Sequence, residues 1–124
     1  MQEVKPDYHF NLDIKFAPLE TIDVNAIVAS CRDEWFNQTL TQVNGSVMRV
    51  GIIRGEFHWH KHDDDDELFF VLSGKLFVDT ERGNFELGPN EGVTVPKGVL
   101  HRTRAPEKVV MLMVENAGIQ PAGD

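Results

Sequence analysis

The sequence predicts an all-β sandwich or barrel that carries one short helix near its N-terminus. From Trp35 onward, strand and turn signals repeat about every 8 to 12 residues, a spacing typical of these two architectures. A helical pattern is found over Thr21–Cys31, and it is short. The 124 residues fit one domain of ordinary size.

The first 34 residues are interpreted as an arm whose short helix packs on a barrel formed by residues 35–124, the two parts making one domain. Within the arm, Asn11–Phe16 alternates polar and apolar side chains as a short strand does. Thr21–Cys31 then places apolar side chains at helical intervals. Asp23 is the expected N-cap of this helix.

The barrel region divides into strands at turns that the sequence marks clearly. Asn44-Gly45 is a strong hairpin signal between Thr39–Val43 and Val47–Ile53. Three further turns are expected near Ser73-Gly74, at Glu81–Asn84 and at Gly88–Gly92. The last strand is expected at Lys108–Asn116. A missing N–H costs least at turns and strand ends, and these are the positions expected for Pro89, Pro96 and Pro106.

Two of the expected strands are apolar on both faces. Glu67–Leu72 and Val109–Val114 lack the alternation of an antiparallel strand that has one face in water. We therefore expect the outer face of the sheet to be covered, either by the N-terminal segment or by a second subunit. The second possibility favours a homodimer.

Composition and charge exclude several classes of protein. The net charge of −8 argues against a nucleic-acid partner, since phosphate binding needs clustered Lys and Arg. The chain shows neither an apolar run long enough for a membrane span nor a signal peptide. Cys31 is the single cysteine, so an internal disulfide and a thiolate zinc site are both excluded. A cytoplasmic protein fits these features best.

A cluster of histidines stands out in the middle of the chain. His58, His60 and His62 alternate, so a strand would place all three on one face, and Glu67 follows at the start of an apolar strand. His101 comes later, after a Pro-Lys-Gly turn. Imidazoles with one carboxylate suit a borderline divalent metal, and a buried carboxylate needs a partner. Spacing alone leaves the alternative open, in which these histidines belong to a polar loop.

The stretches "HWHKHDDDDELFFVLSG" and "VPKGVLHRTRA" resemble the two signature motifs of the cupin superfamily. They read His60-x-His62-x4-Glu67-x6-Gly74 and Pro96-x-Gly98-x2-His101. The resemblance implies a double-stranded β-helix, or jelly-roll barrel. It also implies one divalent transition metal (Fe, Mn, Ni, Zn, Co or Cu) bound by His60, His62, Glu67 and His101. One or two coordination positions would stay open for water or substrate.

The sequence departs from the cupin pattern at three turn or strand-end positions. The glycine that opens the first motif is displaced by one, to Gly55, which points to a bulge there. Asn90 replaces the opening glycine of the second motif, and Ala105 replaces its closing asparagine. None of these changes removes a metal ligand.

Three functions are consistent with such a site. The first is a metal enzyme of the dioxygenase, lyase or isomerase type that acts on a small oxygenated, anionic molecule. Glu56 or His58 would then serve as a base near the metal, unless a bulge turns His58 outward. Arg49, Arg54, Arg102 and Arg104 are candidates to clamp a carboxylate; Arg54 is the expected inward one, whereas Arg102 and Arg104 are expected to face outward. The other two functions are a small-ligand binding cupin without turnover, and a barrel with a purely structural metal.

Overall fold

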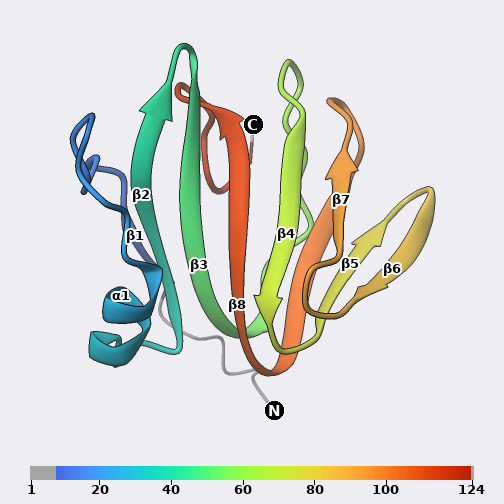
Figure 1. The fold of residues 1–124 in the computed structure, drawn as a ribbon. Helices are drawn as coiled ribbons and strands as arrows, with labels where there is room; N and C mark the ends of the chain where they lie inside the picture. The colour runs from blue at the N-terminus through green and yellow to red at the C-terminus, as the bar shows by residue number, and fades with distance from the viewer. Residues whose placement is uncertain (1–7, 124) are drawn as a thin grey trace.

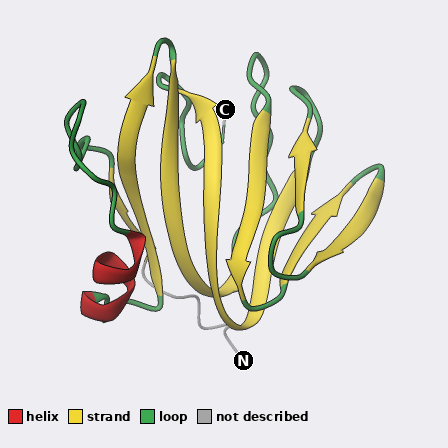
Figure 2. Cartoon of the chain, in the orientation of Figure 1, coloured by secondary structure: helices red, strands yellow, loops and turns green. Residues whose placement is uncertain are grey.

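The computed structural model describes residues 8–123 and shows a β-sheet fold with one short helix (Figures 1 and 2). Its elements are β1 (Tyr8–Asn11), α1 (Val24–Ser30), β2 (Trp35–Val43), β3 (Ser46–Glu56), β4 (Glu67–Ser73), β5 (Leu76–Thr80), β6 (Gly83–Leu87), β7 (Gly92–Val95) and β8 (His101–Asn116). The sheet runs β1-β2-β3-β8-β4-β7 within this part of the chain, and β5 and β6 branch from β8. The prediction of an all-β fold with a short N-terminal helix is confirmed.

β8 joins the two halves of the fold. Its C-terminal half lies between β3 and β4, whereas its first residues, His101 to Arg104, pair with β5. Figure 1 shows this long strand curving from the central sheet toward β5 and β6. One long strand that pairs with β3 and β4 in one part and with β5 in the other is consistent with the predicted jelly roll.

Pro106 does not lie at a strand end, so that prediction is wrong. It lies inside β8, where the pairing with β3 shifts from Ile53↔Val109 to Gly55↔Ala105. The three residues from Pro106 to Lys108 are exposed and unpaired with β3 in this bulge. The proline is tolerated because its missing N–H falls where the ladder is already interrupted.

The N-terminal arm differs in part from its prediction. The helix is confirmed, and the Asp23 carboxylate accepts from the Ala26 N–H at 3.1 Å as its N-cap. The strand, however, ends at Asn11 instead of beginning there. Residues 12–16 cross the edge of β2 with two backbone hydrogen bonds, and Leu12 and Ile14 remain about half exposed. The alternation in this segment therefore does not reflect a buried strand face.

The core has an inner and an outer apolar cluster. The inner one fills the barrel and includes Trp35, Phe57 and Phe69. In the outer one, α1 packs through Ile27 against the outward side chains of the central strands (Figure 1). The arm thus covers much of the face that the apolar strands predicted to be covered, which is the first of the two possibilities that the sequence left open. Across residues 8–123, no helix is long and apolar enough to span a membrane.

Candidate metal centre and the adjoining cavity

Three histidines and one glutamate meet inside the barrel. His60 and His101 form an isolated bridge, each donating its backbone N–H to the other's carbonyl at 2.9 and 2.8 Å. The carbonyl of His62 accepts from the Gly98 N–H at 2.8 Å, which ties the histidine segment to the Pro-Lys-Gly turn. Glu67 is the first residue of β4. His60 and His62 do not lie on a regular strand, yet both point toward the cluster.

Local hydrogen bonds fix the tautomers of two of these rings. Nδ1 of His60 lies 2.9 Å from the His58 carbonyl, and Nδ1 of His101 lies 2.8 Å from the Val99 carbonyl. A carbonyl oxygen only accepts, so Nδ1 must carry the proton in both rings. Nε2 is therefore the basic nitrogen that each ring offers to the cluster. Such orientation by a partner on the other ring nitrogen is typical of metal-binding histidines.

The four donor groups fit a divalent metal. One ligand atom from each of His60, His62, Glu67 and His101 can be chosen so that all lie within 4.8 Å of one another. Oε1 of Glu67 is 3.2 Å from Nε2 of His101 and 3.4 Å from Nε2 of His62. Neither nitrogen of the buried His62 ring makes a hydrogen bond to any described residue. A metal ion would satisfy one of these two nitrogens, and mixed N/O donors suit a transition metal.

Burial and hydrogen bonding hold these groups in the protonation state that a metal needs. Desolvation by burial lowers the pKa of His60 to about 4, so its ring is neutral near pH 7. Burial alone would raise the pKa of Glu67, but the neighbouring Glu115, His101 and His62 side chains outweigh it and leave the pKa below its usual range. A neutral imidazole beside an ionised carboxylate is ready to bind a cation.

A buried polar chain extends from Glu67 away from the histidines, and the sequence reasoning missed it. Glu115 lies directly opposite Glu67 across β4 and β8. Oε1 of Glu115 accepts from Arg49 Nη1 at 2.9 Å, and Nε of Arg49 donates to Thr39 Oγ1 at 3.0 Å. All of these residues are buried. Glu115 and Arg49 occur in apolar strands at inward positions, which was the signal available in the sequence.

The two glutamates share one proton. Burial, with the neighbouring Glu67 carboxylate, raises the pKa of Glu115 to about 10, although Arg49 opposes this shift. Oε2 of Glu115 has no hydrogen-bond partner as a carboxylate. A proton on Oε2 would be donated to Glu67 and would satisfy both groups. We therefore assign the proton to Glu115 and the negative charge to Glu67.

A cavity of about 30 Å³ adjoins the cluster in the barrel interior. His60 and Glu67 line it, together with Trp35, Asn37, Thr103 and Glu115, and its remaining walls are aromatic rings, methionines and Pro121. The C-terminal segment closes one side: the Ala122 carbonyl lies 2.7 Å from Nε2 of His58. A Cβ built on Gly123, whose φ is +96°, would lie 2.6 Å from Cβ of His60, so this approach requires glycine.

The residues proposed from the sequence as clamp and base lie elsewhere. Arg54 is exposed, so the expectation that it faces inward is wrong. Gly51 and Ile53 lie on the inner face of β3. Arg54 directly follows Ile53, so its side chain lies on the outer face. The Glu56 side chain is also exposed and lies 3.6 Å from Arg102. His58 is half-buried, and its carbonyl orients His60 while its ring binds the C-terminal segment.

Arg102 and Arg104 face outward as expected. Both donate through Nε to the buried Oδ2 of Asp79, at 3.1 and 2.7 Å. Burial would raise the pKa of Asp79, but the two guanidinium groups lower it. Arg102 also lies over the exposed Trp59 ring, 5.1 Å from its centroid. These cations are held on the outside of β8 and do not reach the cavity.

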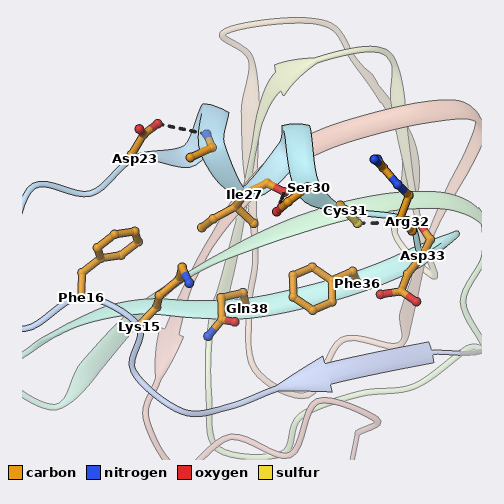
Figure 3. Close-up of a pocket in the computed structure, with 11 residues that line it drawn as sticks. Lys15, Phe16, Asp23, Ile27, Ser30, Cys31, Arg32, Asp33, Phe36 and Gln38 are labelled. Atoms are coloured by element: carbon orange, nitrogen blue, oxygen red, sulfur yellow. Dashed lines mark hydrogen bonds between the residues drawn. The ribbon is translucent and has the colours of Figure 1, made fainter.

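A larger hollow of about 540 Å³ lies between α1 and β2, away from the histidines (Figure 3). Phe16, Ile27 and Phe36 form its apolar sides. Two of its polar groups are engaged: Asp23 caps α1, and Gln38 Nε2 donates to two backbone carbonyls. None of the four candidate metal ligands lines it, so this hollow is separate from the candidate metal centre.

Comparisons with known proteins agree with this geometry. The family described as "Cupin domain" matches residues 47–115, which include all four candidate ligands. An uncharacterized protein of Bacillus subtilis (strain 168), YdbB, is 37% identical over 92 residues, covering 73% of this chain and 81% of that protein.

Two solved structures resemble the fold closely. A cupin-2 domain containing protein from Shewanella frigidimarina has a TM-score of 0.73 and 29% identity, covering 77% of this chain and 94% of its own. NMB1881 from Neisseria meningitidis has a TM-score of 0.69 and 26% identity, covering 78% and 99%. With its fold, its motifs and the family match over more than half of its length, the chain belongs to the cupin family.

Proposed function

We propose that this protein is a metal-dependent cupin enzyme that binds one divalent transition metal through His60, His62, Glu67 and His101. The observation that carries the proposal is the buried His62 ring, whose two nitrogens lack hydrogen-bond partners within a four-donor cluster. A bound metal would polarise an oxygen atom of a small substrate as a Lewis acid. Dioxygenase, lyase and isomerase reactions all remain within this proposal.

The residues of this chain would supply three things besides metal ligands. The carbonyls of His58 and Val99 keep two imidazoles in the tautomer that presents Nε2. Glu115 holds a proton next to Glu67, at the edge of the cavity. The aromatic and methionine walls, with Pro121, exclude water and strengthen the electrostatic interactions inside the cavity.

Metal analysis tests the proposal. Protein purified without chelator should carry about one equivalent of a single metal, and His62→Ala should lose it. His9→Ala is the matched control, because His9 is an exposed histidine paired with Asp33 at 3.1 Å on the outside of the fold. Equal metal content in wild type and His62→Ala, or no metal uptake by either, would refute the proposed site.

A structural metal and a catalytic metal differ in their open positions. Cobalt-loaded protein should change its visible spectrum when azide is added, because azide occupies an open position. An unchanged spectrum would favour a closed structural site. Ligand binding without turnover is the alternative if azide binds but substrate screens find no reaction.

A homodimer and a cytoplasmic location remain predictions. Light scattering of the purified protein tests the first, with a mass of about twice 14.0 kDa expected. A mass of one chain would show that α1 and the arm alone cover the outer face. Fractionation of the native cells tests the second.

A further inference from the structure

Two buried polar atoms at the cavity have no hydrogen-bond partner among the described residues: Trp35 Nε1 and Asn37 Oδ1. Trp35 is 2% exposed and Asn37 is 9% exposed, and both line the cavity beside His60 and Glu67. Buried polar groups are nearly always paired, and an unpaired one costs about 1–3 kcal/mol. One donor and one acceptor left open at the same cavity indicate an occupant that carries the complementary pair.

Besides the polar residues Asn37, His60, Glu67, Thr103 and Glu115, the cavity wall consists of apolar side chains, and the chain keeps the cavity open. Five of its lining residues are large apolar ones: Phe10, Phe57, Phe69, Met111 and Met113. Gly51 is in register with both Asn37 and Met111. A Cβ built on Gly51 would lie 2.9 Å from Cε of Met111 and 3.3 Å from Oδ1 of Asn37. Glycine at this position therefore leaves room for both side chains.

The cavity offers no free cation to a charged ligand. No lysine or arginine lines it in the part of the chain that the structure describes. Arg49, the buried arginine nearby, is bound to Glu115 and Thr39. The remaining candidate clamps from the sequence face outward: Arg54 is exposed, and Arg102 and Arg104 bind Asp79. A carboxylate would thus depend on the metal alone for charge compensation.

The C-terminal segment limits the size of the occupant. A volume of about 30 Å³ is room for about one or two water molecules, so a larger ligand must displace part of the wall. Pro121 is a wall residue of the C-terminal segment, and this segment is held through the contact between Ala122 and His58. This favours ligands of few heavy atoms.

We propose that the cavity binds a small uncharged molecule with a hydroxyl group beside a carbonyl group, as in an α-hydroxyketone. The hydroxyl donates to Asn37 Oδ1, the carbonyl accepts from Trp35 Nε1, and the alkyl part lies against the aromatic and methionine walls. The proposal rests on the proposed function in that the occupant lies beside His60 and Glu67. It replaces the anionic substrate expected from the sequence, which required an inward Arg54.

Hydroxyacetone and glycolate test the proposal, because they have the same number of heavy atoms and differ only by a methyl group in place of a carboxylate oxygen. The readout is the indole N–H signal of Trp35 in ¹H–¹⁵N NMR spectra, distinguished from that of Trp59 with a Trp59→Phe variant. In chelator-treated protein, where no metal recruits the carboxylate, hydroxyacetone should shift the Trp35 signal saturably. Glycolate should bind at least about tenfold more weakly.

Variants separate recognition by the cavity from recognition by the metal. In zinc-loaded protein, Asn37→Leu should weaken hydroxyacetone about tenfold and leave glycolate unchanged, because the metal alone would hold the carboxylate. If Asn37→Leu does not fold, Gly51→Ala serves instead, since its added methyl group crowds Met111 and Asn37. Trp59→Phe, on the outer surface, should leave both probes unaffected.

Three results would overturn the inference: glycolate and hydroxyacetone bind chelator-treated protein with equal affinity, neither probe shifts the Trp35 signal, or both cavity variants bind hydroxyacetone with wild-type affinity. Metal content is measured on the same samples. Metal uptake without a Trp35 shift would sink this inference and leave the proposed function standing. A Trp35 shift in protein that takes up no metal would support this inference and refute the proposed function.

Discussion

The shared proton between Glu67 and Glu115 gives the most specific prediction for stability. In the folded protein the pKa of Glu115 is raised to about 10 by burial and by the Glu67 carboxylate, whereas an unfolded glutamate titrates near its ordinary value. Glu115→Gln mimics the protonated side chain. Its amide can donate to Glu67 as the acid proton does, and its carbonyl oxygen can accept from Arg49 in place of Oε1.

The expected effect follows from proton linkage. Between pH 6 and pH 9 the folded wild type keeps a proton on Glu115 that the unfolded chain has lost. A group whose folded pKa is raised contributes stability at low pH and loses it as the pH rises. The free energy of unfolding should therefore fall by about 1.4 kcal/mol per pH unit, or about 4 kcal/mol over this range. Glu115→Gln has no such group, so its stability should stay nearly level.

Urea unfolding of chelator-treated protein at pH 6, 7, 8 and 9 measures this difference. Because the wild type has already lost stability between the ordinary glutamate pKa and pH 6, the variant should be about 2 kcal/mol more stable at pH 6, and this difference should grow as the pH rises. Glu86→Gln is the control, because Glu86 is a surface residue paired with Lys75. Parallel pH profiles for wild type and Glu115→Gln would show that Glu115 is ionised when folded, and the assignment of the shared proton would be wrong.

Three further predictions follow from the same contacts. Arg49→Met should destabilise the protein by about 1–3 kcal/mol in urea unfolding, because the buried Glu115 Oε1 and Thr39 Oγ1 lose their hydrogen-bond donor. An effect below about 0.5 kcal/mol would contradict this. Chelator-treated Glu115→Gln protein, which lacks the opposite slope of Glu115, should lose stability as the pH falls from about 6.5 toward 4. The unfolded His60 takes up a proton in this range, whereas the folded ring, with its pKa lowered to about 4, stays neutral. Adding His60→Asn should flatten this part of the profile, and an unchanged slope would argue against it. Gly74→Ala should lower the thermal midpoint, because φ is +86° and the new Cβ would lie 2.5 Å from a backbone carbonyl oxygen. Gly83→Ala should lower the midpoint less, because Gly83 has a positive φ but open space around its Cβ position. Equal losses would show that the backbone conformation alone determines the effect.

The sequence allowed the features set by short-range chemistry to be predicted. Asn44 adopts the left-handed conformation that its hairpin requires, with φ at 53°, and Asp23 caps the helix as expected. The four metal-ligand positions have fixed spacing within two short segments, and the structure brings them together. The Arg54 prediction failed although strand alternation from Ile53 was enough to exclude it. That prediction started from the expected need for a cation that binds a carboxylate, and strand alternation was not applied to it.

The polar chain behind the site could not be predicted, because it depends on the register of strands far apart in the sequence. Glu115 faces Glu67 only through the pairing of β8 with β4, and Arg49 reaches Glu115 only through the pairing of β8 with β3. A shift of one residue in either ladder would turn these side chains to the other face. Turn signals locate strands, but they do not fix register across such distances.

The bulge at Pro106 shows how one strand serves both parts of the site. Between Gly55 and Ile53, β3 advances by two residues, while β8 advances by four, from Ala105 to Val109. The bulge therefore adds two residues to β8. Because two is an even number, side chains that face inward before the bulge keep the same alternation after it. His101 is therefore inward before the bulge and Glu115 inward after it. One extra residue instead of two would leave His101 inward and turn Glu115 outward, so the length of this exposed segment couples the candidate metal centre to Glu115.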